Sequence, residues 1–198
     1  MYLILRVAYR VSILDTLHAI LDTINRWSLN RMIKTVLFVC TGNTCRSVMA
    51  EAMFRKMLKE RTKDNNKINV ISAGVSALPG INPTYEAISV MFEQGIDVSQ
   101  HHAQELRKEL IEKADLVLVM ANKHKEYIHK EFPFAQNKTF LLKEFTLNNK
   151  SESNQNNKRN YEIVDPIGRE IEFYRIIARE LKENLEKILD KILKENNK

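Results

Sequence analysis

Short apolar runs alternate along the chain with longer stretches in which apolar residues recur at helical spacing. Short runs without polar alternation are typical of parallel strands buried on both faces, and helical spacing is typical of amphipathic helices. The apolar runs predict strands over 35–39, 68–73, 116–120 and 139–142. The helical spacing predicts helices over 47–61, 84–94, 103–113, 123–131 and 170–194. Strands that alternate with helices favour an α/β fold, with a four-stranded parallel sheet covered by helices on both faces.

Two connections between these elements have an unusual composition. Residues 74–83 include two glycines and two prolines, which predicts an irregular connection. Residues 148–160 are uniformly polar and low in complexity, which predicts a mobile loop. That loop leads to Asp165, so it would either let this carboxylate move over a ligand or be a neutral insertion.

The first 31 residues differ from the rest of the chain. They are rich in apolar residues, but charges such as Arg6, Arg10 and Asp15 interrupt them, so no spanning helix and no stable membrane insertion are expected. They also lack the order of a signal peptide. We therefore expect one domain over 32–198. Residues 1–31 would be either an upstream start assignment, which we prefer, or an amphipathic helix.

Charge and cysteine content narrow the class of protein. The formal net charge is +6, but the lysines lie beside glutamates within the expected helices, which indicates solvated helix faces and no nucleic-acid partner. The chain has only two cysteines, Cys40 and Cys45. A disulfide framework is therefore excluded, and a reducing cytoplasm is the expected location.

The strongest chemical signal lies in residues 36–51, which read VLFVCTGNTCRSVMAE. Cys40 ends an apolar strand, a short loop with Gly42 follows, and Arg46 and Ser47 open a helix. A thiol, loop amides, a helix N-terminus and a guanidinium would thus converge on one point. Such a point binds a phosphate-like dianion and favours the thiolate that attacks it.

Each loop residue has an expected part in this site. The loop amides should cradle phosphate oxygens; they belong to Thr41, Gly42, Asn43, Thr44 and Cys45. Gly42 allows close backbone approach, and Asn43 tolerates a left-handed turn. Arg46 can grip two oxygens in a fork. Ser47 would either cap the helix or hydrogen-bond to the thiolate.

The pattern C-x5-R-S, with CTGNTCRS in full, resembles the phosphate loop of the low-molecular-weight protein tyrosine phosphatase family, and most of all that of its bacterial protein-arginine phosphatases. The resemblance extends over about 33–195. Its further segments are ISAGV at 71–75, GIDVS at 95–99 with His101, ADLVLVM at 114–120, and Asp165-Pro166. Val48 departs from it, since the family usually has proline there, and predicts slightly looser packing of the loop.

The resemblance implies a reaction in two steps. Cys40 would attack phosphorus, Arg46 would stabilise the transferring group, and Asp165 would act first as general acid and then as general base. A phosphocysteine is the implied intermediate, and neither a metal nor a cofactor is implied. Thr44 resembles the arginine-directed members, whereas Ile167 matches neither those nor the tyrosine-directed members.

Several alternatives remain open. The expected substrate is phosphoarginine in proteins, opposed by a protein-arginine kinase, and a phosphotyrosine phosphatase is the nearest alternative. A related arsenate reductase would need cysteines after Arg46, and there are none. A non-catalytic phosphate-binding module would be expected to lack the nucleophile or the acid. Cys45 would either form a reversible disulfide with Cys40 or simply fill space in the loop. The histidines have surface or supporting roles by default.

Overall fold

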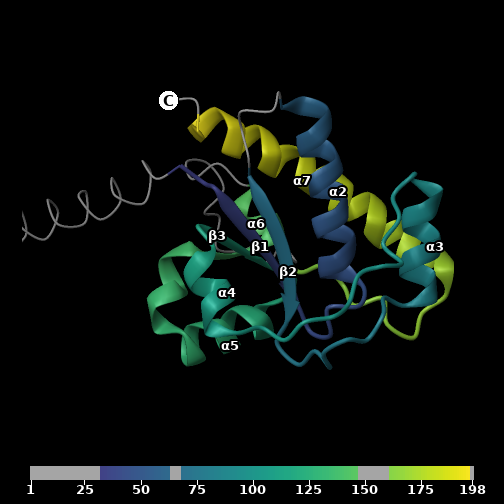
Figure 1. The fold of residues 1–198 in the computed structure, drawn as a ribbon, viewed down its shortest axis with the longest axis horizontal. Helices are drawn as coiled ribbons and strands as arrows, with labels where there is room; N and C mark the ends of the chain where they lie inside the picture. Colours follow the sequence, from purple (N-terminus) through teal and green to yellow (C-terminus); the bar gives the residue numbers. More distant parts are fainter. Residues whose placement is uncertain (1–31, 63–67, 147–160, 197–198) are drawn as a thin grey trace, which may run out of the picture.

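The computed structural model describes residues 32–62, 68–146 and 161–196. In this part of the chain, four parallel strands form one sheet in the order β2-β1-β3-β4. Figure 1 labels the first three of them. The strands are β1 (Thr35–Cys40), β2 (Asn69–Gly74), β3 (Leu116–Val119) and β4 (Thr139–Leu141). The α/β fold with a four-stranded parallel sheet is therefore confirmed. The expected mobile loop at 148–160 and the extension at 1–31 lie outside the described residues.

Strand β1 is central, and its side chains serve two cores. Phe38 packs with helices on one face of the sheet, whereas Leu37 packs into a separate cluster on the other face. This alternation follows from the two-residue period of a strand. Both side chains are completely buried, as expected for the central strand of a sheet covered on both faces.

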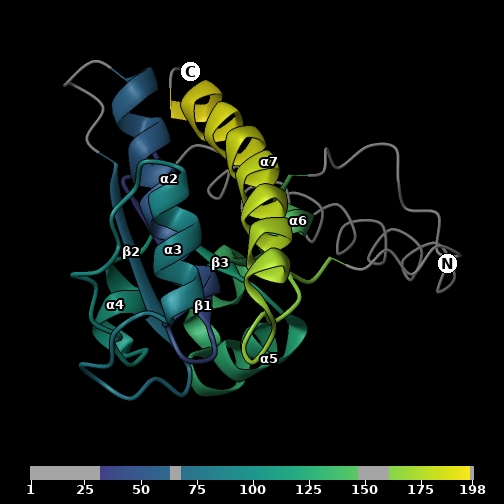
Figure 2. The ribbon, with the colours of Figure 1, turned by 90° about the vertical axis from the view of Figure 1, so that its right-hand side faces the viewer.

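Helices cover both faces of the sheet, as expected. Figure 2 shows α2 (Arg46–Arg61), α3 (Tyr85–Glu93) and α7 (Ile171–Asn196) together on one side. The opposite face carries α4 (Lys108–Lys113), α5 (Asn122–Glu131) and the 3-10 helix η1 (Pro133–Lys138). The short helix α6 (Leu142–Phe145) follows β4. Among the described residues, no helix is long and apolar enough to cross a bilayer.

The C-terminal helix α7 closes the larger core. Its buried residues recur at helical spacing: Tyr174, Ile177, Ala178, Leu181, Leu185, Ile188, Leu189 and Ile192. Near its end, the Asn196 side chain donates to the carbonyl of Ile33 at 2.9 Å and accepts from the Ile33 N–H at 2.8 Å. The two ends of the described domain are thereby joined.

The expected helix over 103–113 is wrong for its first half, because α4 begins only at Lys108. Residues before it run extended beside the end of β2, where Glu105 forms a parallel bridge with Gly74. The Leu106 N–H donates to the Gly74 carbonyl at 2.8 Å, and the Gly74 N–H donates to the Gln104 carbonyl at 3.0 Å. Pairing with a strand edge has overridden the local helical spacing.

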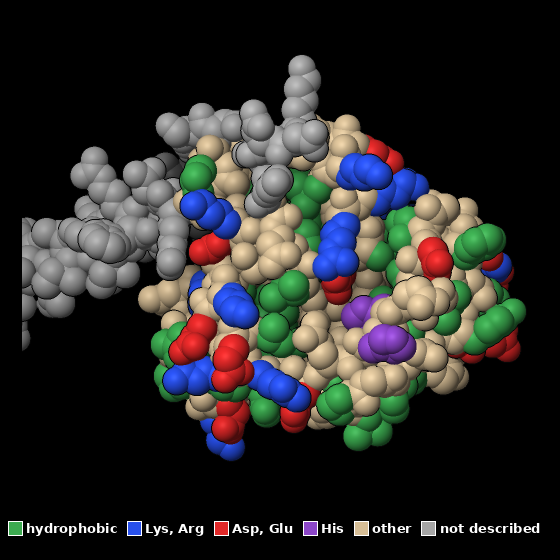
Figure 3. Space-filling model, viewed as in Figure 1, with side chains coloured by type: hydrophobic (Ala, Val, Ile, Leu, Met, Phe, Trp, Pro, Cys, Tyr) green, Lys and Arg blue, Asp and Glu red, His purple; other side chains and the backbone are tan. Residues whose placement is uncertain are grey.

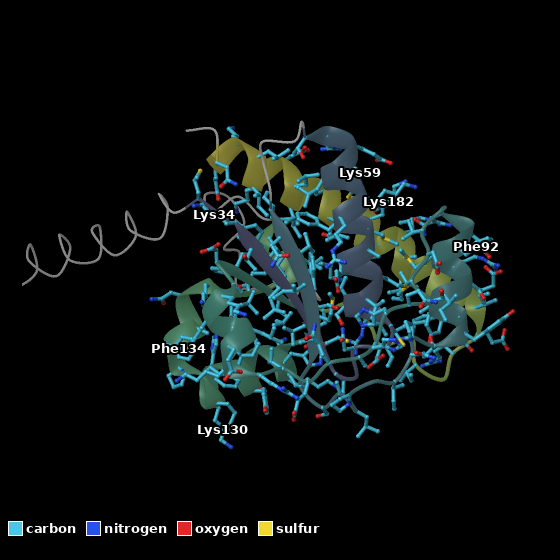
Figure 4. All side chains as sticks on the ribbon, viewed as in Figure 1. Lys34, Lys59, Phe92, Lys130, Phe134 and Lys182 are labelled. Atoms are coloured by element: carbon cyan, nitrogen blue, oxygen red, sulfur yellow. The ribbon has the colours of Figure 1, made fainter. Side chains whose placement is uncertain are left out.

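Basic and acidic side chains are interspersed over the face shown in Figure 3. Figure 4 shows the labelled lysines spread around the molecule: Lys34 before β1, Lys59 on α2, Lys130 on α5 and Lys182 on α7. Ion pairs within helices, such as Arg55 with Glu51, are part of this pattern. The distribution agrees with the interpretation of solvated helix faces.

Candidate active site

The candidate site lies at the carboxyl end of the central strand. Cys40 is the last residue of β1, and α2 begins six residues later at Arg46. The loop between them turns at Asn43, whose φ of 54° lies in the left-handed region. Within the described residues, the N–H groups of Gly42, Thr44 and Cys45 have no hydrogen-bond partner. These donors, together with the N-terminal end of α2, form the kind of concavity that binds an anion.

The thiol of Cys40 is buried, with 2% of the residue exposed, and has two polar neighbours. Its Sγ atom lies 3.0 Å from Ser47 Oγ and accepts from the Asn43 N–H at 3.3 Å. Ser47 makes no capping hydrogen bond, and the N-cap position belongs to Cys45. Of the two expectations for Ser47, the contact with the sulfur is therefore the one that the structure supports.

Asn43 ties the loop to the neighbouring segments. Its Nδ2 donates to Ser47 Oγ at 2.9 Å and to Ser72 Oγ at 2.8 Å. Its Oδ1 accepts from the Gln104 N–H at 2.9 Å and lies 3.2 Å from His101 Nε2. The expected left-handed turn is confirmed, and the side chain satisfies most of its hydrogen-bonding capacity in that position.

A second layer of polar residues supports this network, and none of them was predicted to contact the loop. The buried Ser72 donates to the carboxylate of Glu51, which also pairs with Arg55. The Gln104 side chain donates to the Ser72 carbonyl at 2.8 Å. Buried polar groups that are connected in this way fix one arrangement of a loop.

Arg46 is 2% exposed and reaches two other segments. Its Nη1 donates to the Ile163 carbonyl at 3.0 Å, and its Nη2 forms an ion pair with the Asp165 carboxylate. Nη2 also lies 3.5 Å from Thr41 Oγ1. Its Nε is buried and has no partner among the described residues. An unpaired buried guanidinium N–H is costly, so this atom is available to an anionic ligand.

The segment that carries Asp165 is held against the sheet. The Ile163 N–H donates to the Met120 carbonyl at 2.8 Å, just beyond the end of β3. Asp165 Oδ1 accepts from the Ile167 N–H at 3.3 Å, and about a third of the Asp165 side chain is exposed (35%). A carboxylate that is distant in the sequence thus lies at the mouth of the loop.

The irregular connection 75–84 is fixed to the loop at both ends. The Val75 N–H donates to the Cys40 carbonyl at 3.0 Å, and the Thr84 N–H donates to the Thr44 carbonyl at 3.1 Å. Close approach is needed at Gly74, where an added Cβ would lie 2.5 Å from the Thr41 oxygen. At Gly42 the nearest contact would be 3.4 Å. The glycine that the fold requires here is therefore Gly74.

Cys45 has a different environment from Cys40, and both thiols are free. Its Sγ lies 3.6 Å from Thr84 Oγ1 and 3.6 Å from the Tyr174 hydroxyl. Burial raises the pKa of the Cys45 thiol, so it is protonated at neutral pH. This environment favours a packed residue, and a disulfide with Cys40 stays a prediction.

Two histidines lie beside the loop, and both are neutral at pH 7. Burial, followed by the charges of Arg46 and Lys123, lowers the pKa of His124 to about 3. Burial also lowers the pKa of His101. Among the described residues, no three His, Cys, Asp or Glu side chains are grouped so as to hold a metal ion.

Comparisons with known proteins identify the class. Residues 35–198 match the family model described as low molecular weight phosphotyrosine protein phosphatase. The protein-arginine-phosphatase of Bacillus subtilis (strain 168) is 36% identical over 160 residues, which is 81% of this chain and 97% of the relative. The chain therefore belongs to the low-molecular-weight phosphotyrosine protein phosphatase family.

Solved structures agree with this assignment. A mutant of the arginine phosphatase YwlE, in which serine replaces a cysteine and the active-site serine is phosphorylated, is 36% identical with a TM-score of 0.70; the match covers 81% of this chain and 96% of that one. The low molecular weight protein tyrosine phosphatase of T. tengcongensis is 38% identical with a TM-score of 0.69, and the match covers 79% and 98%. The chain is thus similar to relatives named for either substrate.

Proposed function

We propose that the protein is a cysteine-dependent protein phosphatase that acts on phosphoarginine through a phosphocysteine intermediate. The observation that carries the proposal is the setting of Cys40, whose buried thiol lies between the Ser47 hydroxyl and the Asn43 N–H. The unpartnered loop amides and Arg46 Nε supply donors for a phosphoryl group beside it. Membership of the family supports the same reaction.

In the first step, the Cys40 thiolate attacks phosphorus, so that an S–P bond forms as the bond to the leaving atom breaks. The N–H groups of Gly42, Thr44 and Cys45 and the guanidinium of Arg46 bind the equatorial oxygens, while the Asn43 N–H stays on the Cys40 sulfur. Because these donors are positioned before the substrate arrives, they stabilise the transition state without reorganisation.

Asp165 supplies the proton that the leaving atom needs. Its carboxylate is paired with Arg46 in the unliganded protein, and a phosphoryl dianion that takes up the Arg46 donors would compete for that pairing. Once released, the carboxylate takes up a proton from solvent and then, as general acid, passes it to the leaving nitrogen of the guanidine. It then removes a proton from the water that hydrolyses the phosphocysteine.

The choice of phosphoarginine rests on two residues and on the relatives. Thr44, whose hydroxyl lies in the loop, would hold a guanidinium nitrogen or a water, whereas an aliphatic residue there would pack on a phenyl ring. The residue after Asp165-Pro166 is the exposed Ile167, so this position offers no aromatic side chain to flank a ring. A relative named protein-arginine-phosphatase is matched over 97% of its length.

Phosphotyrosine is the second candidate substrate, and one structural observation favours it. Tyr85 is 78% exposed and directly follows Thr84, whose N–H donates to the carbonyl of Thr44. An aromatic side chain is thus available next to a residue that contacts the loop. The similarity to the T. tengcongensis tyrosine phosphatase points the same way.

Paired turnover of phosphoarginine and phosphotyrosine peptides tests the proposal, with Cys40→Ser as the blank. We expect faster turnover of phosphoarginine, abolished in the blank, and a shift toward phosphotyrosine in Thr44→Ile. A phosphotyrosine preference in the unmodified protein would retain the cysteine chemistry and reject the substrate. Turnover of neither peptide, with phosphate still bound, would favour a non-catalytic phosphate-binding module.

The proposed biological setting follows from this chemistry. The substrates are phosphorylated proteins, and a protein-arginine kinase would oppose the enzyme. A reducing cytoplasm would keep the Cys40 thiol available. The proposed catalytic domain is 32–198, so deletion of residues 1–31 is expected to leave turnover of both peptides unchanged.

A further inference from the structure

His124 is a buried polar residue that the proposed reaction does not use. It lies in the first turn of α5 and is completely buried. Because β1 and β3 are neighbours in the sheet, α5 begins beside the loop that follows β1. His124 Nε2 consequently lies 3.0 Å from Thr41 Oγ1, across 83 positions of sequence.

The ring makes one polar contact and leaves one polar atom unsatisfied. Its Nδ1 is buried and has no hydrogen-bond partner among the described residues. An apolar side chain could fill the same space without leaving a buried polar atom unpaired. What an imidazole adds at this position is therefore its contact with Thr41.

The Thr41 hydroxyl connects this ring to Arg46, whose Nη2 lies 3.5 Å from the same Oγ1 atom. A guanidinium can only donate, so Thr41 must present a lone pair to it. If His124 Nε2 accepts, it takes the hydroxyl hydrogen of Thr41. If Nε2 donates, it fills the second lone pair and leaves that hydrogen for a bound anion. In both tautomers the hydroxyl is prevented from turning its hydrogen toward Arg46.

We propose that His124 is a positioning residue, which holds the Thr41 hydroxyl so that it supports the Arg46 guanidinium in the orientation that binds a phosphoryl group. Since the pKa of His124 is lowered to about 3, the ring adds no positive charge at neutral pH. The ring therefore acts by orienting the Thr41 hydroxyl and not by adding charge to the site. This inference rests on the proposed function.

The test uses two substitutions of His124, each of which can replace a different nitrogen of the imidazole. In His124→Gln an amide can take the place of Nε2, whereas in His124→Asn it can take only the place of Nδ1. Thr41→Val removes the hydroxyl at nearly constant shape. His129→Gln is the matched control, because His129 lies on the same helix and also has a buried nitrogen without a partner among the described residues.

Binding of inorganic phosphate, measured by calorimetry, is the main readout, with kcat and KM for the phosphopeptide beside it. We expect His124→Asn and Thr41→Val each to weaken phosphate binding by about tenfold. His124→Gln should remain within about threefold of the unmodified protein. Combining Thr41→Val with His124→Asn should add nothing further, since His124 acts only through the hydroxyl that Thr41→Val removes.

The outcomes distinguish failure of the positioning role of His124 from failure of the proposed phosphatase function. Equal effects of His124→Gln and His124→Asn would overturn the positioning role, and so would additivity in the double variant. If His124 variants fold poorly, Thr41→Val alone decides, because unchanged phosphate binding in that variant would also overturn the role. Failure of the unmodified protein to bind phosphate and to turn over phosphopeptide would instead reject the proposed function.

Discussion

Cys40 Sγ and Ser47 Oγ lie 3.0 Å apart, although the two residues belong to different elements. Asn43 Nδ2 donates to the same Ser47 oxygen at 2.9 Å. Asn43 fills one lone pair of that oxygen, and the hydroxyl keeps its hydrogen for a thiolate at Cys40, which can only accept. Ser47 is thereby placed to stabilise a thiolate at Cys40 and again when the thiolate is the leaving group.

Ser47→Ala should therefore reduce turnover without unfolding the protein. A hydrogen bond to a charged group is worth enough to lower kcat by roughly 10- to 100-fold. Alkylation of Cys40 by iodoacetamide should slow in parallel, because the hydroxyl that stabilises negative charge on the attacking sulfur is gone. Ser76→Ala is the control, since Ser76 is exposed and only its N–H contacts the loop. Unchanged alkylation in Ser47→Ala would contradict this role.

Because Asp165 pairs with Arg46, the change Asp165→Asn should strengthen the binding of phosphate and weaken turnover. Asp165→Asn removes a carboxylate that competes with phosphate for Arg46, so inorganic phosphate should bind more tightly. The same change removes the proposed general acid and should lower kcat by about 100-fold or more. Calorimetry and steady-state kinetics measure the two effects. Loss of phosphate binding in Asp165→Asn would show that the carboxylate serves the fold of the site instead.

Gly74→Ala should displace the phosphate loop. Its Cβ would meet the Thr41 oxygen at 2.5 Å and the Asn43 nitrogen at 2.9 Å. Overpacking against backbone should cost about 2 kcal/mol of stability, and misplacement of the loop should lower kcat by about 100-fold. Urea denaturation and turnover assays measure the two quantities.

Gly80→Ala separates this clash from backbone strain. Gly80 has a φ of 85°, but an added Cβ would meet no atom within 4 Å. This change should cost about 1 kcal/mol of stability and leave kcat unchanged. If both glycine variants lose turnover equally, the clash with the loop is not the cause.

The lowered pKa of His124 predicts that the free energy of unfolding falls in acid. Its pKa is about 3 in the folded protein, against an ordinary value of 6.5. Between these values the unfolded chain binds the proton and the folded chain does not. The stabilisation is therefore complete above about pH 6.5 and is lost as the pH falls toward 3.

This effect can be isolated by comparison with His124→Gln. Between pH 7 and pH 4.5, the unmodified protein should lose about 2 kcal/mol more unfolding free energy than the variant. His101, whose pKa is lowered by burial, shifts both proteins alike and cancels in the difference. Urea denaturation at the two pH values measures it, and parallel losses would mean that His124 is accessible to protons when folded.

Much of the fold and the local part of the site could be predicted from the sequence. Apolar runs and helical spacing are local patterns, so the four strands and the long helix α7 were predictable within a few residues. Cys40 and Arg46 are also close in sequence, and a strand followed by a helix leaves little freedom for the loop between them. Pairing with Gly74 decided the extended course of 103–107, which no local pattern indicates.

The sequence by itself determined the α/β class and the loop from Cys40 to Arg46, because short-range geometry is set by neighbouring residues. Only the tertiary structure decided which distant side chains meet that loop. The order β2-β1-β3-β4 places the ends of β1 and β3 together, which brings His124 to Thr41 and the Asp165 segment to Arg46. Such contacts depend on which strands become neighbours, and periodicity along the chain carries no information about that choice.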